Sequence, residues 1–182
     1  MERLLDLSAR FRHELPDGTR RKLLAEAIEI GERLASPLSL AKASQYAGDF
    51  WWEKKSYDLA EQYFERSRSL LETDKSSHGE AAKLWTSLGV SLYHTHASAL
   101  WWARSRSRHA EATRHYEGMA KYVIYLRPPD PDDDSIDSVP LTRREYLERA
   151  ATAYQTAGPE FSGDLGRVRR QIQTEFGNGP FR

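Results

Sequence analysis

Four of the six histidines are grouped in one part of the sequence, where they could in principle bind a transition metal: His94, His96, His109 and His115. In a helix, His94 and His96 would point about 200° apart, so they could not hold one ion together. No glutamate completes a His-Glu-x-x-His arrangement either. We therefore interpret the histidines as ordinary core or surface residues, and we predict neither a metal site nor a cofactor.

Three aspartates at alternate positions, Asp130, Asp132 and Asp134, match the first three ligands of a calcium-binding loop. The match ends there, because Ser135 stands where the turn needs glycine and Leu141 stands where the loop needs a bidentate glutamate. We interpret the stretch as a solvated loop. The sequence also lacks a glycine-rich phosphate loop, a Gly-x-Ser-x-Gly elbow and any cysteine, so we predict that the chain is not an enzyme.

An aromatic and basic stretch has the side chains to bind nucleic acid, because rings stack on bases and arginines pair with phosphates. In the alternative interpretation, one tryptophan lies in the core of a helical hairpin and the arginines solvate the connection between its helices. Both interpretations stay open at this point. The residues of the stretch are Trp101, Trp102, Arg104, Arg106 and Arg108, and a second basic patch contains Arg167, Arg169 and Arg170.

The composition limits the classes of partner. Twenty-seven basic residues balance twenty-seven acidic ones, so net charge does not direct the chain to nucleic acid or to an anionic membrane. No apolar run approaches the roughly 20 residues that span a bilayer. Residues 1–15 lack the apolar core of a signal peptide, and the absence of cysteine fits a reducing compartment. We expect a cytoplasmic protein without a membrane partner.

Apolar residues recur at intervals of three and four, which predicts an all-α fold. Ser36 before Pro37, and Thr142 three residues before Glu145, are typical helix starts. A break near Ser105–Ser107 is expected, although one continuous helix there stays open. We expect one helical domain over residues 1–182, with N-terminal helices in 1–35, a hairpin in 37–73, an elongated hairpin in 80–127, an acidic loop in 128–141 and C-terminal helices in 142–176.

Small and aromatic residues repeat along the predicted hairpins. The first copy contains Gly48, Trp51, Ala60, Phe64 and Ser67, and this order resembles the tetratricopeptide (TPR) repeat at its usual spacing. In such a repeat the small residues let two helices approach while the aromatic rings fill the space around them. The resemblance implies antiparallel helical hairpins stacked as a right-handed superhelix.

Further copies of the pattern follow, over about residues 37–157 in all. Gly89 resembles the glycine of a first helix, and Ala112 resembles the small residue of its partner. The gap between them is eleven residues longer than the gap from Gly48 to Ala60. That excess predicts a hairpin lengthened by about three turns. A third copy of the second helix contains Ala150, Tyr154 and Ala157.

The resemblance implies a concave groove lined by the first helix of each hairpin. We therefore expect a non-catalytic adaptor or scaffold that binds a peptide or helix of another protein, with Trp52 and Tyr93 as anchors. The alternative is a nucleic-acid-associated helical-repeat protein that uses the stretch from Trp101 to Arg108. The sequence does not indicate an oligomeric state. The expected partner-binding residues are Lys42, Gln45, Asp49, Trp52, Lys83, Thr86, Val90 and Tyr93.

Overall fold

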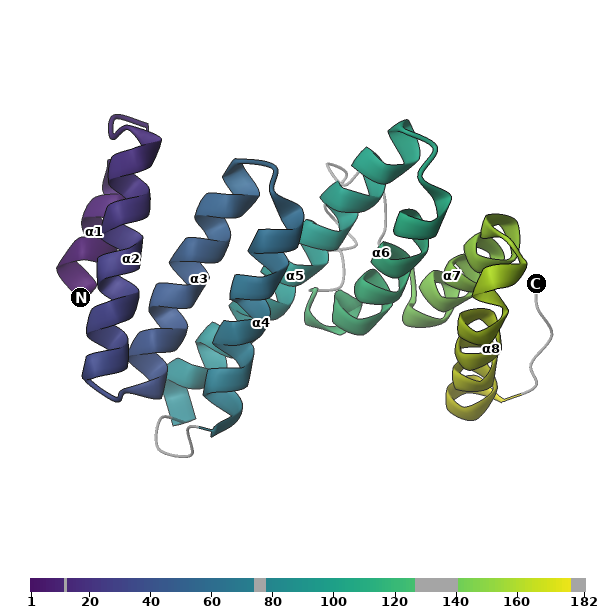
Figure 1. Cartoon of the computed structure of the whole chain (residues 1–182). Helices are drawn as coiled ribbons and strands as arrows, with labels where there is room; N and C mark the ends of the chain where they lie inside the picture. The colour runs from purple at the N-terminus through teal and green to yellow at the C-terminus, as the bar shows by residue number, and fades with distance from the viewer. Residues whose placement is uncertain (12, 74–77, 127–140, 178–182) are drawn as a thin grey trace, which may run out of the picture. The chain divides into compact units, whose positions relative to one another are not determined.

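The computed structural model describes residues 1–11, 13–73, 78–126 and 141–177, and these residues are almost entirely helical (Figure 1). No strand occurs in these four ranges, so the predicted all-α class is confirmed for them. The elements are α1 (Glu2–Arg10), α2 (Asp17–Arg33), α3 (Pro37–Glu53), α4 (Tyr57–Thr73), α5 (His78–Ser105), α6 (His109–Tyr122), the 3₁₀ helix η1 (Val123–Tyr125), α7 (Arg143–Ala157), the 3₁₀ helix η2 (Pro159–Phe161) and α8 (Ser162–Phe176).

The same short turn connects three pairs of successive helices. Three residues separate α2 from α3, α3 from α4, and α5 from α6. The middle residue of each turn has a positive φ, 49° at Ala35, 57° at Lys55 and 54° at Ser107. In the latter two turns the next amide donates to a carbonyl five residues earlier, which closes the end of the first helix. A repeated local structure thus folds the chain back without glycine.

Packing divides the chain into two compact units, Met1–Ser91 (unit 1) and Leu92–Arg182 (unit 2), and the boundary falls within α5. In unit 1, α1 to α4 form antiparallel hairpins (Figure 1). The core shared by α1, α2 and α3 contains Leu5 of α1, Leu24 and Ala27 of α2, and Ala43 and Phe50 of α3. Burial of these apolar side chains is the main force that holds the hairpins together.

Within unit 1, α3 and α4 come close at Gly48. A Cβ atom on this glycine would lie 2.5 Å from Cε1 of Phe64, whose ring is buried. Beside that contact, the buried Ser67 hydroxyl of α4 donates to the main-chain oxygen of Ala41 over 2.7 Å. Gly48, Phe64 and Ser67 thus all lie at the contact between α3 and α4.

Unit 2 contains the second half of α5 with α6, α7 and α8. Its fully buried side chains include Tyr122, Leu147 and Val168. The capping box predicted at the start of α7 is confirmed, because Glu145 N donates to Thr142 Oγ1 and Thr142 N donates to the Glu145 carboxylate. In this unit the tight glycine contact is at Gly118 of α6, where a Cβ atom would collide with the ring of His96.

The longer second hairpin owes its length to one helix. Helix α5 has 28 residues, whereas α2, α3 and α4 have 17 each. Residues 106–108 separate α5 from α6, so residues 80–126 do not form one continuous helix. The acidic loop predicted at 128–141, with Asp130, Asp132 and Asp134, falls outside the described residues except for its last residue. The single domain and the right-handed superhelix stay predictions.

We predict that Gly48→Leu lowers the free energy of unfolding by about 2 kcal/mol or more, because any side chain there forces the buried Phe64 ring away from α3. Urea denaturation of the full chain measures the change. The control is Gly18→Leu in α2, where an added Cβ meets no atom within 4 Å. Equal urea midpoints for the two variants would show that α3 and α4 do not meet at Gly48.

Candidate functional site

An open hollow of about 430 Å³ lies in unit 1 between α1, α3 and the first part of α5. Two polar contacts fix α3 to α5 beside it. Lys42 forms an ion pair with Glu80, and Gln45 Nε2 donates to Ser87 Oγ over 3.1 Å. We call this space the α5-side hollow. It is lined by Glu2, Leu5, Asp6, Lys42, Gln45, Tyr46, Glu80, Lys83, Leu84 and Ser87.

A second hollow of about 250 Å³ lies against α1, α2 and the last turns of α3. We call it the Asp49 hollow. Trp52 stands in its lining with 41% of its surface exposed. Tyr46 lines both hollows, so together they form one groove along α3. The Asp49 hollow is lined by Ser8, Ala9, Arg20, Tyr46, Asp49, Trp52 and Glu53.

Helix periodicity explains why the lining residues of α3 share one face. Successive helical residues are rotated by about 100°, so residues three and four apart lie side by side. Gly48 is turned toward Phe64 of α4, and Phe50 is turned into the core shared with α1 and α2. The remaining arc of roughly 120° has Asp49 near its centre. It presents Lys42, Gln45, Tyr46, Asp49, Trp52 and Glu53 to the groove.

Of the two carboxylates in the lining of the Asp49 hollow, those of Glu53 and Asp49, only Glu53 has a cationic partner among the described residues. Arg20, which is only 5% exposed, donates from Nη1 to Glu53 over 2.7 Å and stacks on the Phe50 ring at 5.0 Å. Among the described residues, the Asp49 carboxylate accepts no hydrogen bond and joins no ion pair. Burial, and secondly the nearby Glu53 carboxylate, raise the pKa of Asp49 to about 6. Arg20 therefore neutralises Glu53 and leaves Asp49 uncompensated.

The groove contains five of the eight residues predicted to bind a partner. Lys42, Gln45 and Lys83 line the α5-side hollow, and Asp49 and Trp52 line the Asp49 hollow. The other three residues, Thr86, Val90 and Tyr93, lie outside both hollows. Thr86 is exposed on α5, and Val90 of the same helix is half-buried.

Tyr93 corrects the expectation of a second exposed anchor. It belongs to unit 2, where it is 8% exposed and shares a 2.6 Å hydrogen bond with the hydroxyl of Tyr146 in α7. The two rings meet edge to face. The repeat spacing predicted that Tyr93 would match Trp52, but packing against α7 buries it.

The aromatic and basic stretch is divided between exposed and internally stacked side chains. Trp101 is 73% exposed at the end of α5. The ring of Trp102 carries the guanidinium groups of Arg106 and Arg108, at 4.2 and 4.6 Å from its centre. Arg108 also pairs with Glu111. One ring and two arginines of the stretch are thus engaged with one another, while Trp101 and Arg104 face solvent.

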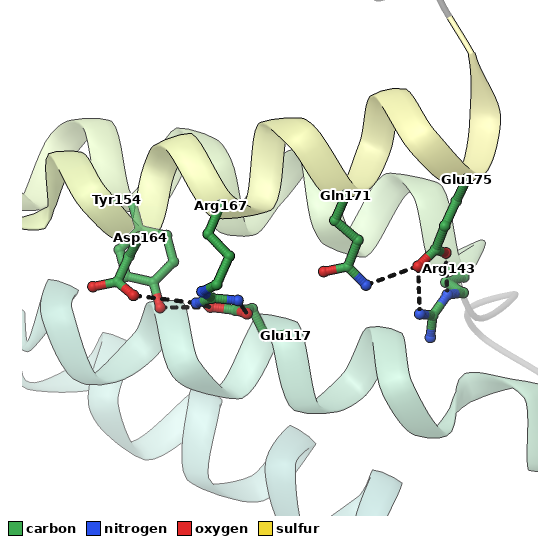
Figure 2. Close-up of polar contacts among 7 residues, drawn as sticks. All are labelled: Glu117, Arg143, Tyr154, Asp164, Arg167, Gln171 and Glu175. Atoms are coloured by element: carbon green, nitrogen blue, oxygen red, sulfur yellow. Dashed lines mark hydrogen bonds and ion pairs between the residues drawn. The ribbon is translucent and has the colours of Figure 1, made fainter.

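Arg167, one of the three arginines of the second basic patch, is neutralised by contacts within unit 2 (Figure 2). Arg167 of α8 donates from both terminal nitrogens to the Glu117 carboxylate of α6, over 2.7 and 3.0 Å. It also pairs with Asp164, and the Tyr154 hydroxyl of α7 donates to Glu117 as well. Burial and the bond to Glu117 raise the pKa of Tyr154 to about 12. Glu117 of α6 therefore links α6 to both α7 and α8, and Arg167 is a structural partner in this contact.

A second ion pair on the same face of α8 completes this network. Arg143, the first residue of α7, donates to both oxygens of Glu175 at 2.8 and 3.0 Å, and to the main-chain oxygen of Ala120 at 2.8 Å. Gln171 donates to Glu175 as well (Figure 2). These hydrogen bonds lower the pKa of Glu175 to about 2. The charges on this face of α8 serve to hold α6, α7 and α8 together.

Two of the four histidines considered as metal ligands meet inside unit 2. The Nδ1 atoms of His96 and His115 are 3.3 Å apart, so one imidazole donates to the other, and the His96 ring stacks on Tyr122. Burial, followed by the charges of His115, Arg114 and Lys121, lowers the pKa of His96 to about 3. His94, two residues away on α5, is exposed. His96, held neutral in this position, acts as a packing residue.

Within the described ranges, no group of three or more histidine, aspartate or glutamate side chains is arranged to hold a metal ion. In the same ranges, every helix is too short or too polar to cross a membrane.

Sequence reasoning missed the groove residues that α1, α2 and the end of α3 supply. Glu2 and Asp6 of α1 line the α5-side hollow, and Arg20 of α2 lines the Asp49 hollow. The repeat pattern begins at Pro37 and carries no information on the two helices before it. Glu53 had a detectable signal, since it follows Asp49 by four residues and therefore shares its face.

Comparisons of the chain with protein-family models, with curated proteins and with solved structures give no match. The resemblance to TPR repeats therefore rests on the residues of this sequence alone.

The buried histidine pair predicts a loss of stability in acid. An unfolded histidine takes up a proton near pH 6.5, whereas folded His96 resists it down to about 3. Between those values the unfolded chain binds more protons, so the free energy of unfolding falls as the pH falls, by up to about 1.4 kcal/mol per pH unit. Urea denaturation at several pH values measures this slope.

The variant His96→Asn keeps a hydrogen-bonding group near Nδ1 but cannot titrate in this range. It is expected to be less stable than the natural chain at neutral pH, because it loses the ring that stacks on Tyr122. Between about pH 6 and pH 4, its free energy of unfolding should nevertheless change less steeply with pH. The difference should correspond to about one bound proton. Identical slopes for the two chains would show that His96 is not held neutral by burial.

Proposed function

We propose that this chain is a non-catalytic adaptor or scaffold that binds a peptide or helix of another protein in the groove of unit 1. The observation that carries the proposal is the groove itself, in which four helices, α1, α2, α3 and α5, present side chains to two adjoining hollows. We further propose that the hairpins form a TPR-like helical repeat. This is supported by the three-residue turn that recurs between successive helices and by the packing of Gly48 on Phe64.

The chemistry of the groove fits a peptide better than a small substrate. Its hollows are open, and they combine aromatic surface at Tyr46 and Trp52 with polar side chains on four helices. Protein interfaces gain most of their binding energy from a few aromatic or arginine anchors with a polar rim around them. Trp52 has the exposure and the position of such an anchor.

The exposed Trp101 favours a second candidate, binding of single-stranded nucleic acid at the end of the α5–α6 hairpin. Trp101 has a free ring, and Arg104 is a cation without an ion pair in the described part of the chain. The stacking of Arg106 and Arg108 on Trp102 weakens this candidate, because it uses the groups that would otherwise face bases and phosphates. We therefore place it second.

The two exposed tryptophans provide a matched test. We predict that Trp52→Ala lowers the affinity for peptides selected from a random peptide array by about tenfold or more, a loss of about 1.4 kcal/mol. Trp101→Ala, the same change in unit 2, should alter the affinity by less than about twofold. Fluorescence anisotropy with the full-length chain measures both, and circular dichroism confirms that each variant stays helical.

The opposite ranking would overturn the proposal. If Trp101→Ala, or Arg104, Arg106 and Arg108 changed together to glutamine, abolishes binding while Trp52→Ala has no effect, the hairpin end is the site. A single-stranded oligonucleotide then serves as the second probe. Steep weakening of its binding with salt is the signature of phosphate contacts and would favour the nucleic-acid candidate.

A further inference from the structure

We infer that the Asp49 hollow receives a lysine or arginine side chain of the bound peptide, with the cation against the Asp49 carboxylate and the aliphatic stem along Trp52. This inference rests on the proposed function and adds the chemical class of the partner: a segment with a basic side chain at a fixed position.

Charge complementarity is the first argument. The side chains that line the two hollows include five carboxylates and three cations, although the chain as a whole carries no net charge. Two of the three cations are already used, since Lys42 pairs with Glu80 and Arg20 pairs with Glu53. The groove is therefore locally acidic, and a basic segment is attracted to it.

The position of Asp49 is the second argument. Its carboxylate lies at the middle of the α3 face that lines the groove, in a hollow large enough for a side chain. The residue is half-buried beside the Glu53 carboxylate and has no compensating cation among the described residues, so its charge is partly desolvated at some cost in free energy. An ammonium or guanidinium group in the hollow would remove that cost, so binding energy would concentrate at this point.

The surroundings of Asp49 are the third argument. Trp52 follows it by three residues and Tyr46 precedes it by three, so the two rings flank the carboxylate on the same helical face. Lysine and arginine place their methylene stems on apolar surface while the charged end reaches a polar group. Rings beside a carboxylate suit such a side chain, because a cation is also attracted to their faces.

The hollow next to the Asp49 hollow favours a peptide as the source of the cation. Tyr46 belongs to the lining of both hollows, so they adjoin along α3. A peptide can place a basic side chain at Asp49 while its neighbouring residues lie along α3, whereas a free metal ion or amine would occupy the Asp49 hollow alone.

The test uses the full-length chain on an array of short random peptides. Peptides that bind the natural chain should be enriched in lysine or arginine, and replacing that residue by norleucine should weaken binding by about tenfold. Asp49→Asn should weaken binding of the same peptides equally, and it should add little to the norleucine change, because both remove one interaction. Asp49→Asn is expected to fold normally, since it removes an uncompensated charge.

The control is Asp58→Asn, the same substitution at an exposed position of α4 that lines neither hollow. It should weaken binding by less than about twofold. An equal effect of Asp58→Asn and Asp49→Asn would overturn the inference, because it would mean that only the general charge of unit 1 matters.

Failure of the inference is distinguishable from failure of the proposed function. If the bound peptides depend on Trp52 but show no preference for lysine or arginine, or if Asp49→Asn leaves their affinity unchanged, the inference is wrong and the groove remains the binding site. If no peptide binds, or if Trp52→Ala has no effect on those that do, both are wrong.

Discussion

The packing of α3 on α4 at Gly48 determines which side chains of unit 1 remain to bind a partner. With Gly48 against Phe64 and Phe50 in the core of α1 and α2, two sides of α3 are occupied. Helix periodicity then leaves one face, and that face has Asp49 near its centre. A side chain larger than hydrogen at position 48 would turn or displace α3, so the shape of the groove depends on a contact on the opposite side of the helix.

The two units use their charged residues differently. In unit 2, Arg167 pairs with Glu117 and Arg143 pairs with Glu175 (Figure 2). Both pairs join different helices, so they hold α6, α7 and α8 together. In unit 1, Arg20 and Glu53 form a similar pair but leave Asp49 beside it without a cation. A half-buried carboxylate without a cation costs stability, so its presence in a hollow supports the proposal that this surface binds a partner.

The helices and part of the groove could be predicted from the sequence, because the signals for them lie within a few residues of one another. Proline at position 37 and the Thr142–Glu145 capping box mark helix starts whatever the rest of the chain does. Spacing of three and four residues placed Lys42, Gln45, Asp49 and Trp52 on one face. Burial of Tyr93 could not be predicted, because it depends on α7, some 50 residues further along the chain. Arg20 was missed for the same reason, since its partner Glu53 lies on another helix.

The pKa of the Asp49 carboxyl group measures most directly whether the groove holds a desolvated acid without a cation. A carbon-13 NMR titration of the full-length chain gives this value, with Asp49→Asn to assign the signal. We expect a pKa of about 6, set by burial and by the neighbouring Glu53, and a fall when a lysine-bearing peptide fills the hollow. A pKa at or below the ordinary aspartate value of 3.8 in the free chain would show that Asp49 is solvated or already paired, and would contradict a cation site in the groove.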